Sequence, residues 1–351
     1  MRVGISLLTL VPGVVGGSET YARELVRGLG RAGQEDYEIF TPSIVDDVEG
    51  RQVESYRASR TMPGRLVAMT EALARSGRLR REMGVDGLEA IHFPLTVMLP
   101  RVEHPPAAVS LLDIQHVFFP EFFSRAERAY RRFAYGSSLR RARTVIAISA
   151  HVRETLVERM GIEPDRVAVI HLGLDHDLFR PGGEPREQFL LYPANPWPHK
   201  NHARLFRAFE QLRRRRPELR LVLTGTGLER LTPPAGVVVR GRVPREELAS
   251  LYRRASALVF PSLYEGFGQP PLEAMASGTP VASSTAGSLP EVCGNAARYF
   301  DPLSVDEMVE SVDTVLHDPQ PLVERGLARA AEFTWDACAR AHDEVYRALA
   351  A

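Results

Sequence analysis

The sequence predicts an α/β protein with two doubly wound, Rossmann-like parallel sheets whose domains face a central cleft. Three observations support this prediction. The chain has 351 residues, more than one hydrophobic core usually fills. Short β-branched apolar runs alternate with helical patterns, as in βαβ units. The same alternation starts again in the second half, after a stretch rich in proline and glycine.

Six apolar runs in the first half predict the strands of the first sheet. The apolar start from Val3 to Val15 has the hydropathy of a signal peptide, but it continues into a loop and a helical pattern, so we interpret it as the first strand. The segment from Val45 to Met83 offers no motif that we can interpret. The six runs are RVGISLLTL from Arg2, YEIF from Tyr37, AIHF from Ala90, AVSLLDI from Ala108, TVIAIS from Thr144 and VAVIHLG from Val167.

A linker pattern divides the chain near Arg180. LDHDLFRPGGEP, from Leu174 to Pro185, contains prolines and glycines that interrupt regular structure. We therefore expect one domain over 1–180, a second over 181–333, and a terminal helix over 334–351 that packs back toward the first domain. The expected strands of the second domain are FLLYPA from Phe189, LRLVLTG from Leu219, GVVVRGRV from Gly236, ALVFPS from Ala257 and PVASS from Pro280.

Composition excludes several classes of protein. With 44% hydrophobic and 25% charged residues the chain is neither disordered nor fibrous. Its 44 basic and 44 acidic residues cancel, which argues against a nucleic-acid-binding protein. The two cysteines, Cys293 and Cys338, have no metal-ligand spacing and favour a reducing compartment. No run approaches the roughly 20 apolar residues of a membrane span, so we expect a soluble cytoplasmic protein.

Ligands of doubly wound sheets bind where the carboxyl ends of the strands meet, so a site is expected in the loops that follow strands. After the first strand, Gly16 and Gly17 allow a close backbone approach, and Ser18 is positioned to cap the next helix. The amino end of a helix attracts phosphate. An ordinary tight turn explains these glycines equally well.

Lys200, in YPANPWPHKNH, is the only lysine in the chain. Arginine supplies every other basic side chain, whereas a compact ammonium fits a crowded pocket as a point charge on phosphate. We therefore predict that Lys200 binds a pyrophosphate, the alternative being an exposed helix start. Asn195 and Asn201 lie nearby and are less specific.

The segment with the most candidate site residues is FPSLYEGFGQPPLEAMASGTPV. In it a predicted buried strand is followed by a glycine-bearing loop and a helix from about Pro270 or Pro271. Glu265 precedes the loop and Glu273 lies in the first helical turn, where acidic residues are also favoured for structural reasons alone. Carboxylates repel phosphate, so we predict that both accept hydrogen bonds from sugar and ribose hydroxyls. The amides predicted to face a diphosphate are those of Gly266, Phe267, Gly268 and Gln269.

Two further loops carry polar residues. Ser288 and Glu291, in GSLPEV, have the spacing of a capping box and are interpreted as a helix start. Asp113 and His116 follow the strand from Ala108, and either could position an acceptor hydroxyl. Turn formation is an equally good explanation for that pair, and His116 is the less certain of the two.

Taken together, these segments resemble the retaining glycosyltransferases of family 4, which have the two-domain GT-B fold. The likeness covers nearly the whole chain. The segments that carry it are GGSETYARELVRGL, LLDIQHVFFPEFF, VIAISAHVRETL, VAVIHLGLDHDLF, YPANPWPHKNH, LVLTGTG and EGFGQPPLEAMASGTPVASSTAGSLPEV. Two of them, LDIQHVFFPEFF and YPANPWPHKNH, look most like the mannosyltransferase branch of O-antigen and polysaccharide biosynthesis, which implies GDP-mannose as donor.

The resemblance also implies roles for individual residues. Glu265 would contact the donor sugar and Glu273 the ribose. Val243, in the GRV segment, would lie beside the base. The diphosphate would be held by Lys200, the Gly16–Gly17 loop and the amides of the EGFG segment. Asn195 and Leu272 would also belong to the donor site. No metal or other cofactor is implied, and the donor phosphate would help to deprotonate the acceptor on the face that it leaves.

The chain departs from the family pattern at two positions. Leu112 stands where many relatives have a histidine, so a catalytic histidine cannot be transferred there, and His116 is only a hypothetical substitute. Ala194 stands where some members carry an arginine, which would leave Lys200 with more of the phosphate charge. The leucine at position 112 is the only observation that supports a catalytically silent subunit.

Other classes fit less well. A non-hydrolysing nucleotide-sugar epimerase would share the fold but lacks the EGFG carboxylate pattern, and an NAD-dependent oxidoreductase would need a G-x-G-x-x-G after the first strand. The expected partners are a nucleotide-sugar donor and a saccharide or lipid-linked acceptor. Arginine runs at 125–143 and 213–216 are compatible with peripheral contact to anionic lipid, although solvated helix faces explain them as well.

Overall fold

The computed structural model describes residues 1–13, 16–112 and 114–351, without the side chain of Met62. The chain folds into two compact units. Unit 1 comprises Met1–Gly173 and Trp335–Ala351, and unit 2 comprises Leu174–Thr334. Leu174 and Thr334, the ends of unit 2, pair with each other in an isolated parallel β-bridge.

The described part of unit 1 forms a seven-stranded parallel sheet in the order β3-β2-β1-β4-β5-β6-β7. All six predicted strands are present, although the first ends at Ser6, and β3 was not predicted. The strands are β1 Arg2–Ser6, β2 Asp36–Pro42, β3 Arg51–Val53, β4 Ala90–Phe93, β5 Ala107–Leu111, β6 Thr144–Ala147 and β7 Val167–Val169. The helices are α1 Gly17–Ala32, α2 Met62–Ala74, α3 Ser76–Met83, α4 Gln115–Phe118, α5 Arg125–Arg141, α6 Ala150–Met160 and α13 Trp335–Ala350.

Unit 2 forms a six-stranded parallel sheet in the order β10-β9-β8-β11-β12-β13 within the described residues. The five predicted strands are confirmed, and β13 is additional. The strands are β8 Glu187–Pro193, β9 Arg220–Thr224, β10 Val237–Gly241, β11 Ala255–Phe260, β12 Val281–Ser284 and β13 Ala297–Phe300. The helices are α7 His202–Arg215, α8 Arg245–Arg254, α9 Gln269–Ala276, α10 Leu289–Cys293, α11 Val305–His317 and α12 Gln320–Ala330.

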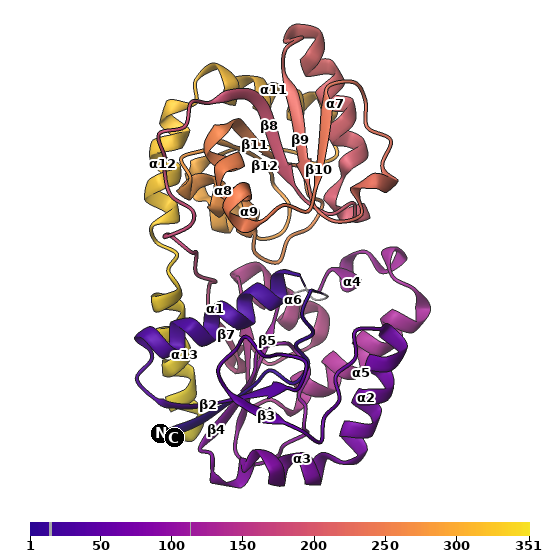
Figure 1. Cartoon of the computed structure of the whole chain (residues 1–351), viewed down its shortest axis with the longest axis vertical. Helices are drawn as coiled ribbons and strands as arrows, with labels where there is room; N and C mark the ends of the chain where they lie inside the picture. Colours follow the sequence, from indigo (N-terminus) through magenta and orange to yellow (C-terminus); the bar gives the residue numbers. More distant parts are fainter. Residues whose placement is uncertain (14–15, 113) are drawn as a thin grey trace. The chain divides into compact units, whose positions relative to one another are not determined.

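Helices cover both faces of each sheet, because parallel strands that are apolar on both sides need apolar cover on both sides. In unit 1, α1 and α13 lie on one face, and α5, with α2 packed against it, lies on the other (Figure 1). In unit 2, α7 and α11 lie on one side of the sheet and α8, α9 and α12 on the other (Figure 1). In the described residues no helix is long and apolar enough to cross a membrane.

A buried polar network joins the C-terminal helix α13 to the sheet of unit 1. The hydroxyl of Tyr21 lies 2.8 Å from Ser110 Oγ and 3.1 Å from His342 Nε2. His92 Nδ1 lies 2.8 Å from the Tyr346 hydroxyl, and its Nε2 lies 2.8 Å from Ser110 Oγ. Both histidines are fully buried. Burial lowers the pKa of His342 to about 4 and that of His92 well below its usual value.

We therefore expect acid to destabilise unit 1. A histidine whose pKa is lowered in the folded state stabilises the fold fully above about pH 6.5 and loses that contribution as the pH falls toward 4. For His342 alone the loss between pH 7 and pH 5 is about 2 kcal/mol. Trp335, which is buried in α13, reports unfolding of this unit when Trp197 is replaced by Phe. His342→Gln should flatten the slope of stability against pH, whereas the exposed His104→Gln should retain it; equal slopes would contradict this account.

Candidate functional site

Lys200 and Glu265 come together at the centre of the unit 2 sheet. Lys200 follows β8 and Glu265 follows β11, and these neighbouring strands mark the point where the strand order reverses. Open α/β sheets bind ligands beyond the carboxyl ends of the strands at this switch point. Lys200 Nζ lies 2.5 Å from Glu265 Oε1, and each side chain is 13% exposed. Two of the residues predicted to contact the donor thus form a largely buried ion pair.

Main-chain and side-chain hydrogen bonds fix the two loops against each other. The amide of Leu263 donates to the carbonyl of His199 at 2.7 Å. Asn201 Nδ2 donates to the carbonyl of Pro261 at 3.0 Å, and the Tyr192 hydroxyl donates to the carbonyl of Lys200 at 2.6 Å. The side chain of Asn201 therefore has a structural role, because it joins the two loops. These bonds fix the backbone at Lys200, and the bond to Glu265 holds its ammonium, so that less conformational entropy is lost when a ligand binds.

Ser288 supports the loop that carries Glu265, which is not the role that the sequence predicted. The predicted capping box is wrong: no side-chain cap is formed at α10, because Ser288 already has helical backbone angles. Its hydroxyl instead lies 3.0 Å from the carbonyl oxygen of Glu265 and 2.7 Å from that of Phe267, to which it donates. The Ser288 amide also donates to the carbonyl of Glu265, at 3.1 Å.

Gly287 lets the α10 segment approach this loop closely. Its φ is +61°, and a Cβ at this position would lie 2.4 Å from the carbonyl oxygen of Glu265 and 2.9 Å from its amide nitrogen. Only glycine therefore fits without moving Glu265. The contacts of Ser288 and Gly287 with the Glu265 loop were not predicted, although the Gly-Ser pair directly before LPEV indicates a tight turn.

Helix α9 begins at Gln269, one position before the expected start, with Gly268 as its N-cap at φ +112°. Pro270 and Pro271 then occupy the first turn and have no N–H to offer. An anion at this helix end would therefore face the segment from Gly266 to Gln269 rather than the two proline positions that follow it. Phe267 is buried and packs edge-on against Phe333, with ring centroids 5.8 Å apart.

Glu273 is half-buried in α9 and accepts a hydrogen bond from the Tyr252 hydroxyl at 2.8 Å. Burial raises the pKa of Glu273 to about 7, although the bond from Tyr252 and the charge of Arg245 act in the opposite direction. The carboxylate thus titrates near neutrality. Tyr252 is a functional candidate that no sequence signal indicated.

Protonation of Glu273 should control ligand binding and stability in opposite directions. If the ionised carboxylate accepts bonds from ribose hydroxyls, donor affinity rises about tenfold from pH 6 to pH 8, in proportion to the ionised fraction. Because the folded-state pKa is raised, stability falls as the pH rises from about 4.5 to about 7 and levels off above that range. Glu273→Gln should remove the dependence of donor affinity on pH and the pH-dependent stability change that Glu273 causes. It should weaken donor binding about 10- to 100-fold and raise the free energy of unfolding at pH 8 by about 1 to 3 kcal/mol. Calorimetric titration and chemical denaturation of both proteins at pH 6 and pH 8 test this; an unchanged pH dependence of binding in the variant would refute it.

Three other residues predicted to bind the donor lie in unit 2. The Asn195 side-chain oxygen accepts the amide of Thr226 at 2.7 Å and so ties the loop after β8 to the loop after β9. Val243 is half-buried in the loop after β10. Leu272 is fully buried, so any part of its side chain in donor binding is indirect, through the position of α9.

The first loop of unit 1 differs from the expectation at Ser18. Helix α1 begins at Gly17 with Gly16 as its N-cap, and no side chain caps it, so the predicted capping role of Ser18 is wrong. Glu19 instead accepts the amide of Gly13 at 2.8 Å and pairs with Arg23 at 2.9 Å. The positive end of α1 therefore already holds a carboxylate. A Cβ on Gly16 or Gly17 would meet no atom of the described residues within 4 Å.

The predicted acceptor residues belong to the loop after β5. Asp113 lies outside the described residues. His116 lies in α4, where its ring packs edge-on against Phe123 and Tyr135 with centroids 6.2 and 5.9 Å away. In the described residues no three His, Cys, Asp or Glu side chains come together in a way that could hold a metal ion.

Two family models match consecutive parts of the chain. The model described as Glycosyl transferases group 1 matches residues 176–332, and the model described as Glycosyltransferase Family 4 matches residues 15–178. O-antigen chain mannosyltransferase B of Escherichia coli is 30% identical over 374 aligned residues, covering 94% of this chain and 95% of the relative.

Two solved structures share the fold. Sucrose-phosphate synthase from Thermosynechococcus elongatus has a TM-score of 0.79 at 20% identity, with 99% of each chain covered. HepE from Anabaena, in complex with UDP-glucose, has a TM-score of 0.71 at 17% identity, with 99% of this chain and 100% of that chain covered.

Proposed function

The chain is a glycosyltransferase of family 4 with the GT-B fold that uses a nucleotide-sugar donor, and from that premise we propose that it transfers mannose from GDP-mannose to a saccharide or lipid-linked acceptor. The observation that carries the choice of sugar is the full-length likeness to an O-antigen chain mannosyltransferase. We propose that unit 2 binds the donor and that unit 1 binds the acceptor.

Lys200 is the proposed cation for the donor diphosphate. An ammonium has three N–H donors, so Lys200 can keep one bond to Glu265 and direct the others to phosphate oxygens. The loop from Gly266 to Gln269 at the positive end of α9 would supply amides to the same diphosphate. The charge that develops on the leaving diphosphate would thus be balanced without a metal ion.

The two carboxylates of unit 2 are proposed to bind hydroxyl groups. Glu265, held beside Lys200, would accept bonds from the donor sugar, and Glu273, held by Tyr252, would bind the ribose. Asn195 and Val243 would line the remainder of the nucleotide site, and Leu272 would hold α9 in place. The proposed reaction retains the anomeric configuration, with a donor phosphate oxygen taking the acceptor proton.

Unit 1 supplies the remaining proposed contacts. The backbone at Gly16 and Gly17 would approach the diphosphate, although Glu19 at the same helix end opposes a second anion there. Asp113 and His116 would orient the acceptor hydroxyl. These roles rest on the family likeness of the two loops.

A transfer assay tests this proposal. Purified protein is incubated with each of GDP-mannose, UDP-glucose and dTDP-glucose and with a set of saccharide acceptors in EDTA. Products are identified by mass spectrometry, and the new anomeric centre by NMR. We expect a mannosyl product with the α configuration of the donor. Transfer from another donor would correct the sugar assignment, and an inverted product would contradict the retaining mechanism. Donor binding without transfer to any acceptor would favour a silent subunit.

A further inference from the structure

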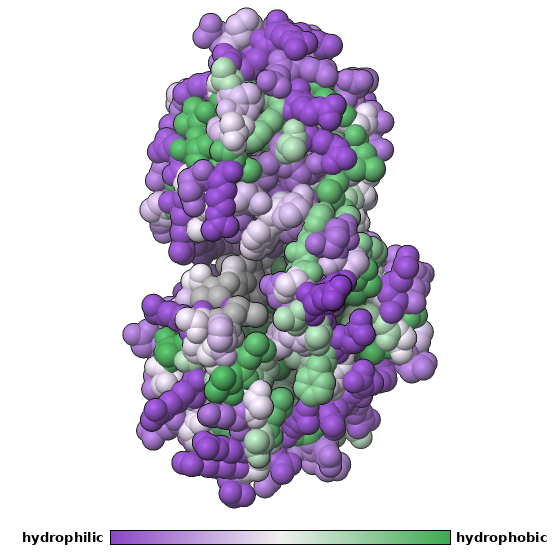
Figure 2. All heavy atoms as spheres, turned by 90° about the vertical axis from the view of Figure 1, so that its right-hand side faces the viewer, coloured by the Kyte–Doolittle hydropathy of each residue, from purple (hydrophilic) through white to green (hydrophobic). Residues whose placement is uncertain are grey.

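Trp197 is an exposed tryptophan in the loop that carries Lys200. The chain has two tryptophans, of which Trp335 is 4% exposed and Trp197 is 51% exposed. Exposed apolar side chains that lie singly among polar neighbours are ordinary on protein surfaces. Figure 2 shows such a surface, where hydrophobic patches are interspersed among hydrophilic side chains. Exposure alone therefore assigns no role to Trp197. What distinguishes it is how firmly it is held.

The backbone of Trp197 is restrained on both sides. Pro196 and Pro198 flank it, and their rings fix φ before and after the tryptophan. The Trp197 amide donates to the carbonyl of Asn195 at 2.8 Å, and its carbonyl accepts the amide of Lys200 at 2.9 Å. Trp197 is also the N-cap of the short 3-10 helix that ends at Lys200. The position of the indole is therefore coupled to the backbone of the lysine that we propose to bind the diphosphate.

Neighbouring segments restrict this loop further. The Asn195 side-chain oxygen accepts the amide of Thr226 at 2.7 Å. A Cβ on Gly227 would lie 3.6 Å from Pro196 Cγ, so the loop after β9 lies against this one. The indole itself lies beside the buried ring of His199, with centroids 5.7 Å apart and planes 32° apart. An exposed aromatic side chain on so fixed a loop loses little conformational entropy when a ligand packs against it.

We propose that the indole of Trp197 is a platform for the pyranose ring of a saccharide substrate, an inference that rests on the donor site proposed at Lys200 and Glu265. One face of a pyranose presents C–H groups and is apolar, whereas the hydroxyl groups project from its edge. An aromatic plane therefore buries the C–H face while polar groups bind the hydroxyls. Glu265, which pairs with Lys200 at 2.5 Å, is the proposed acceptor for such hydroxyls.

The order of the strands favours a sugar ring over the nucleobase. In the described sheet of unit 2, β8 and β11 are neighbours, so the Trp197 loop and the Glu265 loop follow adjacent strands. The base is proposed to lie beside Val243, after β10, and β9 separates β10 from β8. A donor hexose is bonded directly to the diphosphate, whereas the base is attached through the ribose. The ring on the platform is that of the donor hexose or of a saccharide acceptor, because both present the same C–H face.

The fluorescence of Trp197 tests this proposal. Trp335 is the only other tryptophan of the chain, so the signal of Trp197→Phe can be subtracted from that of the unmodified protein. Protection of Trp197 from acrylamide quenching is measured with GDP-mannose, UDP-glucose and dTDP-glucose, each compared with its own nucleoside diphosphate. Methyl α-mannoside is then added to protein saturated with the diphosphate that binds, as a probe for an acceptor sugar.

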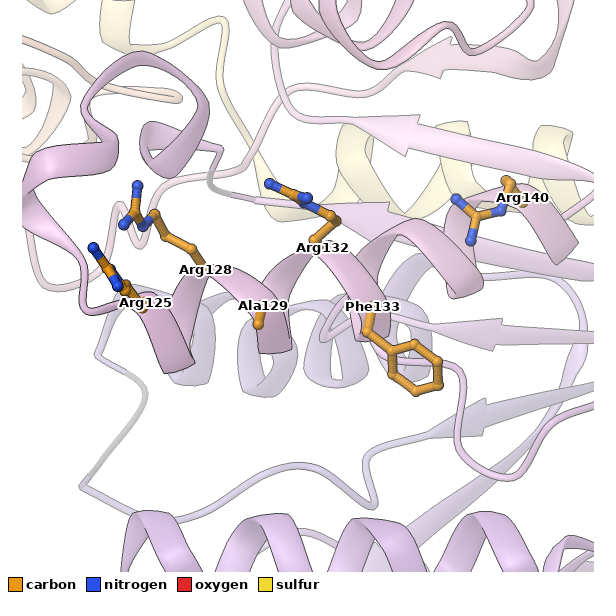
Figure 3. A pocket seen from close by; sticks show the side chains of 6 residues that line it. All are labelled: Arg125, Arg128, Ala129, Arg132, Phe133 and Arg140. Atoms are coloured by element: carbon orange, nitrogen blue, oxygen red, sulfur yellow. The ribbon is translucent and has the colours of Figure 1, made fainter.

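Affinities of two variants complete the test. Trp197→Ala should weaken binding of the nucleotide sugar about tenfold, the loss expected for roughly 50 Å² of apolar contact, and should change the affinity for the diphosphate less than about twofold. Phe133→Ala is the matched control. Phe133 lies in α5 of unit 1, is 60% exposed, and points to the opposite side of the helix from the four arginines in Figure 3. It should leave both affinities unchanged, and equal melting temperatures check that both variants fold.

Each outcome supports or overturns the proposal. Protection by a nucleotide sugar but not by its diphosphate, with weaker binding to Trp197→Ala, would assign the ring to the donor. Protection that appears only with methyl α-mannoside, which then binds about tenfold more weakly to Trp197→Ala, would assign it to the acceptor. Equal protection by a diphosphate and its nucleotide sugar would overturn the proposal, because the contact would be with the base or the ribose. Binding of all these compounds without any protection of Trp197 would overturn it as well.

A further variant separates this inference from the proposed function. Binding of a nucleotide sugar that is weakened in Lys200→Ala but leaves Trp197 unprotected would overturn the platform alone. Failure of every nucleotide to bind, or an affinity that is unchanged in Lys200→Ala, would overturn the donor site at Lys200 and Glu265 and the platform with it.

Discussion

Lys200→Ala is expected to lower kcat/KM for sugar transfer by about 100- to 1000-fold, the usual cost of removing one group that stabilises developing negative charge. Lys200 is the only lysine in the chain, and in the described residues its ammonium is the partner of Glu265 at 2.5 Å. Its loss removes the proposed phosphate contact and leaves a largely buried carboxylate without its ion-pair partner. Steady-state kinetics with the identified donor measure the effect.

Two further variants separate chemistry from the loss of an ion pair. Glu265→Gln keeps a hydrogen-bond acceptor for Lys200 but removes the charge, and it should also abolish most of the transfer while the protein stays folded. Arg253→Ala removes a comparable ion pair of unit 2, with Glu184 at 2.6 Å, outside the proposed site, and should keep full activity. Full turnover in Lys200→Ala or Glu265→Gln would show that the donor site is elsewhere.

Gly287→Ala should disrupt the donor loop without changing any residue proposed to contact the donor. The new methyl group would lie 2.4 Å from the carbonyl oxygen of Glu265, and φ is +61°. Overpacking and left-handed strain together should cost about 2 to 4 kcal/mol of stability. Because the Glu265 loop must shift, we expect donor affinity to fall at least about tenfold, the cost of losing one good hydrogen bond.

Gly278→Ala is the matched control for backbone strain. Gly278 has φ +76°, and a Cβ there would meet no atom within 4 Å in the described part of the chain, so this variant tests the left-handed conformation alone. It should lose only about 1 to 2 kcal/mol of stability and keep its donor affinity. Chemical denaturation and calorimetric titration of both variants make the comparison. Equal donor affinities in the two variants would mean that the contact between Gly287 and Glu265 does not position the site.

Much of the fold could be predicted from periodicity. β-branched apolar runs identified eleven of the thirteen strands of the described sheets, because buried parallel strands are apolar on both faces. The exceptions are β3, whose RQV is short and polar, and β13, whose ARYF carries an exposed arginine. Both are edge strands, where one side of the ladder is open and the apolar signal is weak.

The donor site was predictable where a residue stands out in the sequence. A lone lysine and the EGFG loop were visible, and the structure places Lys200 beside Glu265. The roles of Ser288 and Tyr252 were not visible, because each depends on a contact between segments far apart in the chain. Ser288 has capping-box spacing, but its helical backbone angles turn the hydroxyl toward the Glu265 loop. Local patterns cannot indicate such tertiary partners.

The most direct test of the donor site is the melting temperature of the purified protein with GDP-mannose, UDP-glucose or dTDP-glucose, each with and without EDTA. We predict stabilisation by GDP-mannose, about 2.7 kcal/mol at a hundredfold excess over Kd, unchanged by EDTA and lost in Lys200→Ala. Stabilisation that EDTA removes, or that survives in Lys200→Ala, would contradict the metal-independent site proposed at Lys200 and Glu265, and so would the absence of a response to any of the three nucleotide sugars.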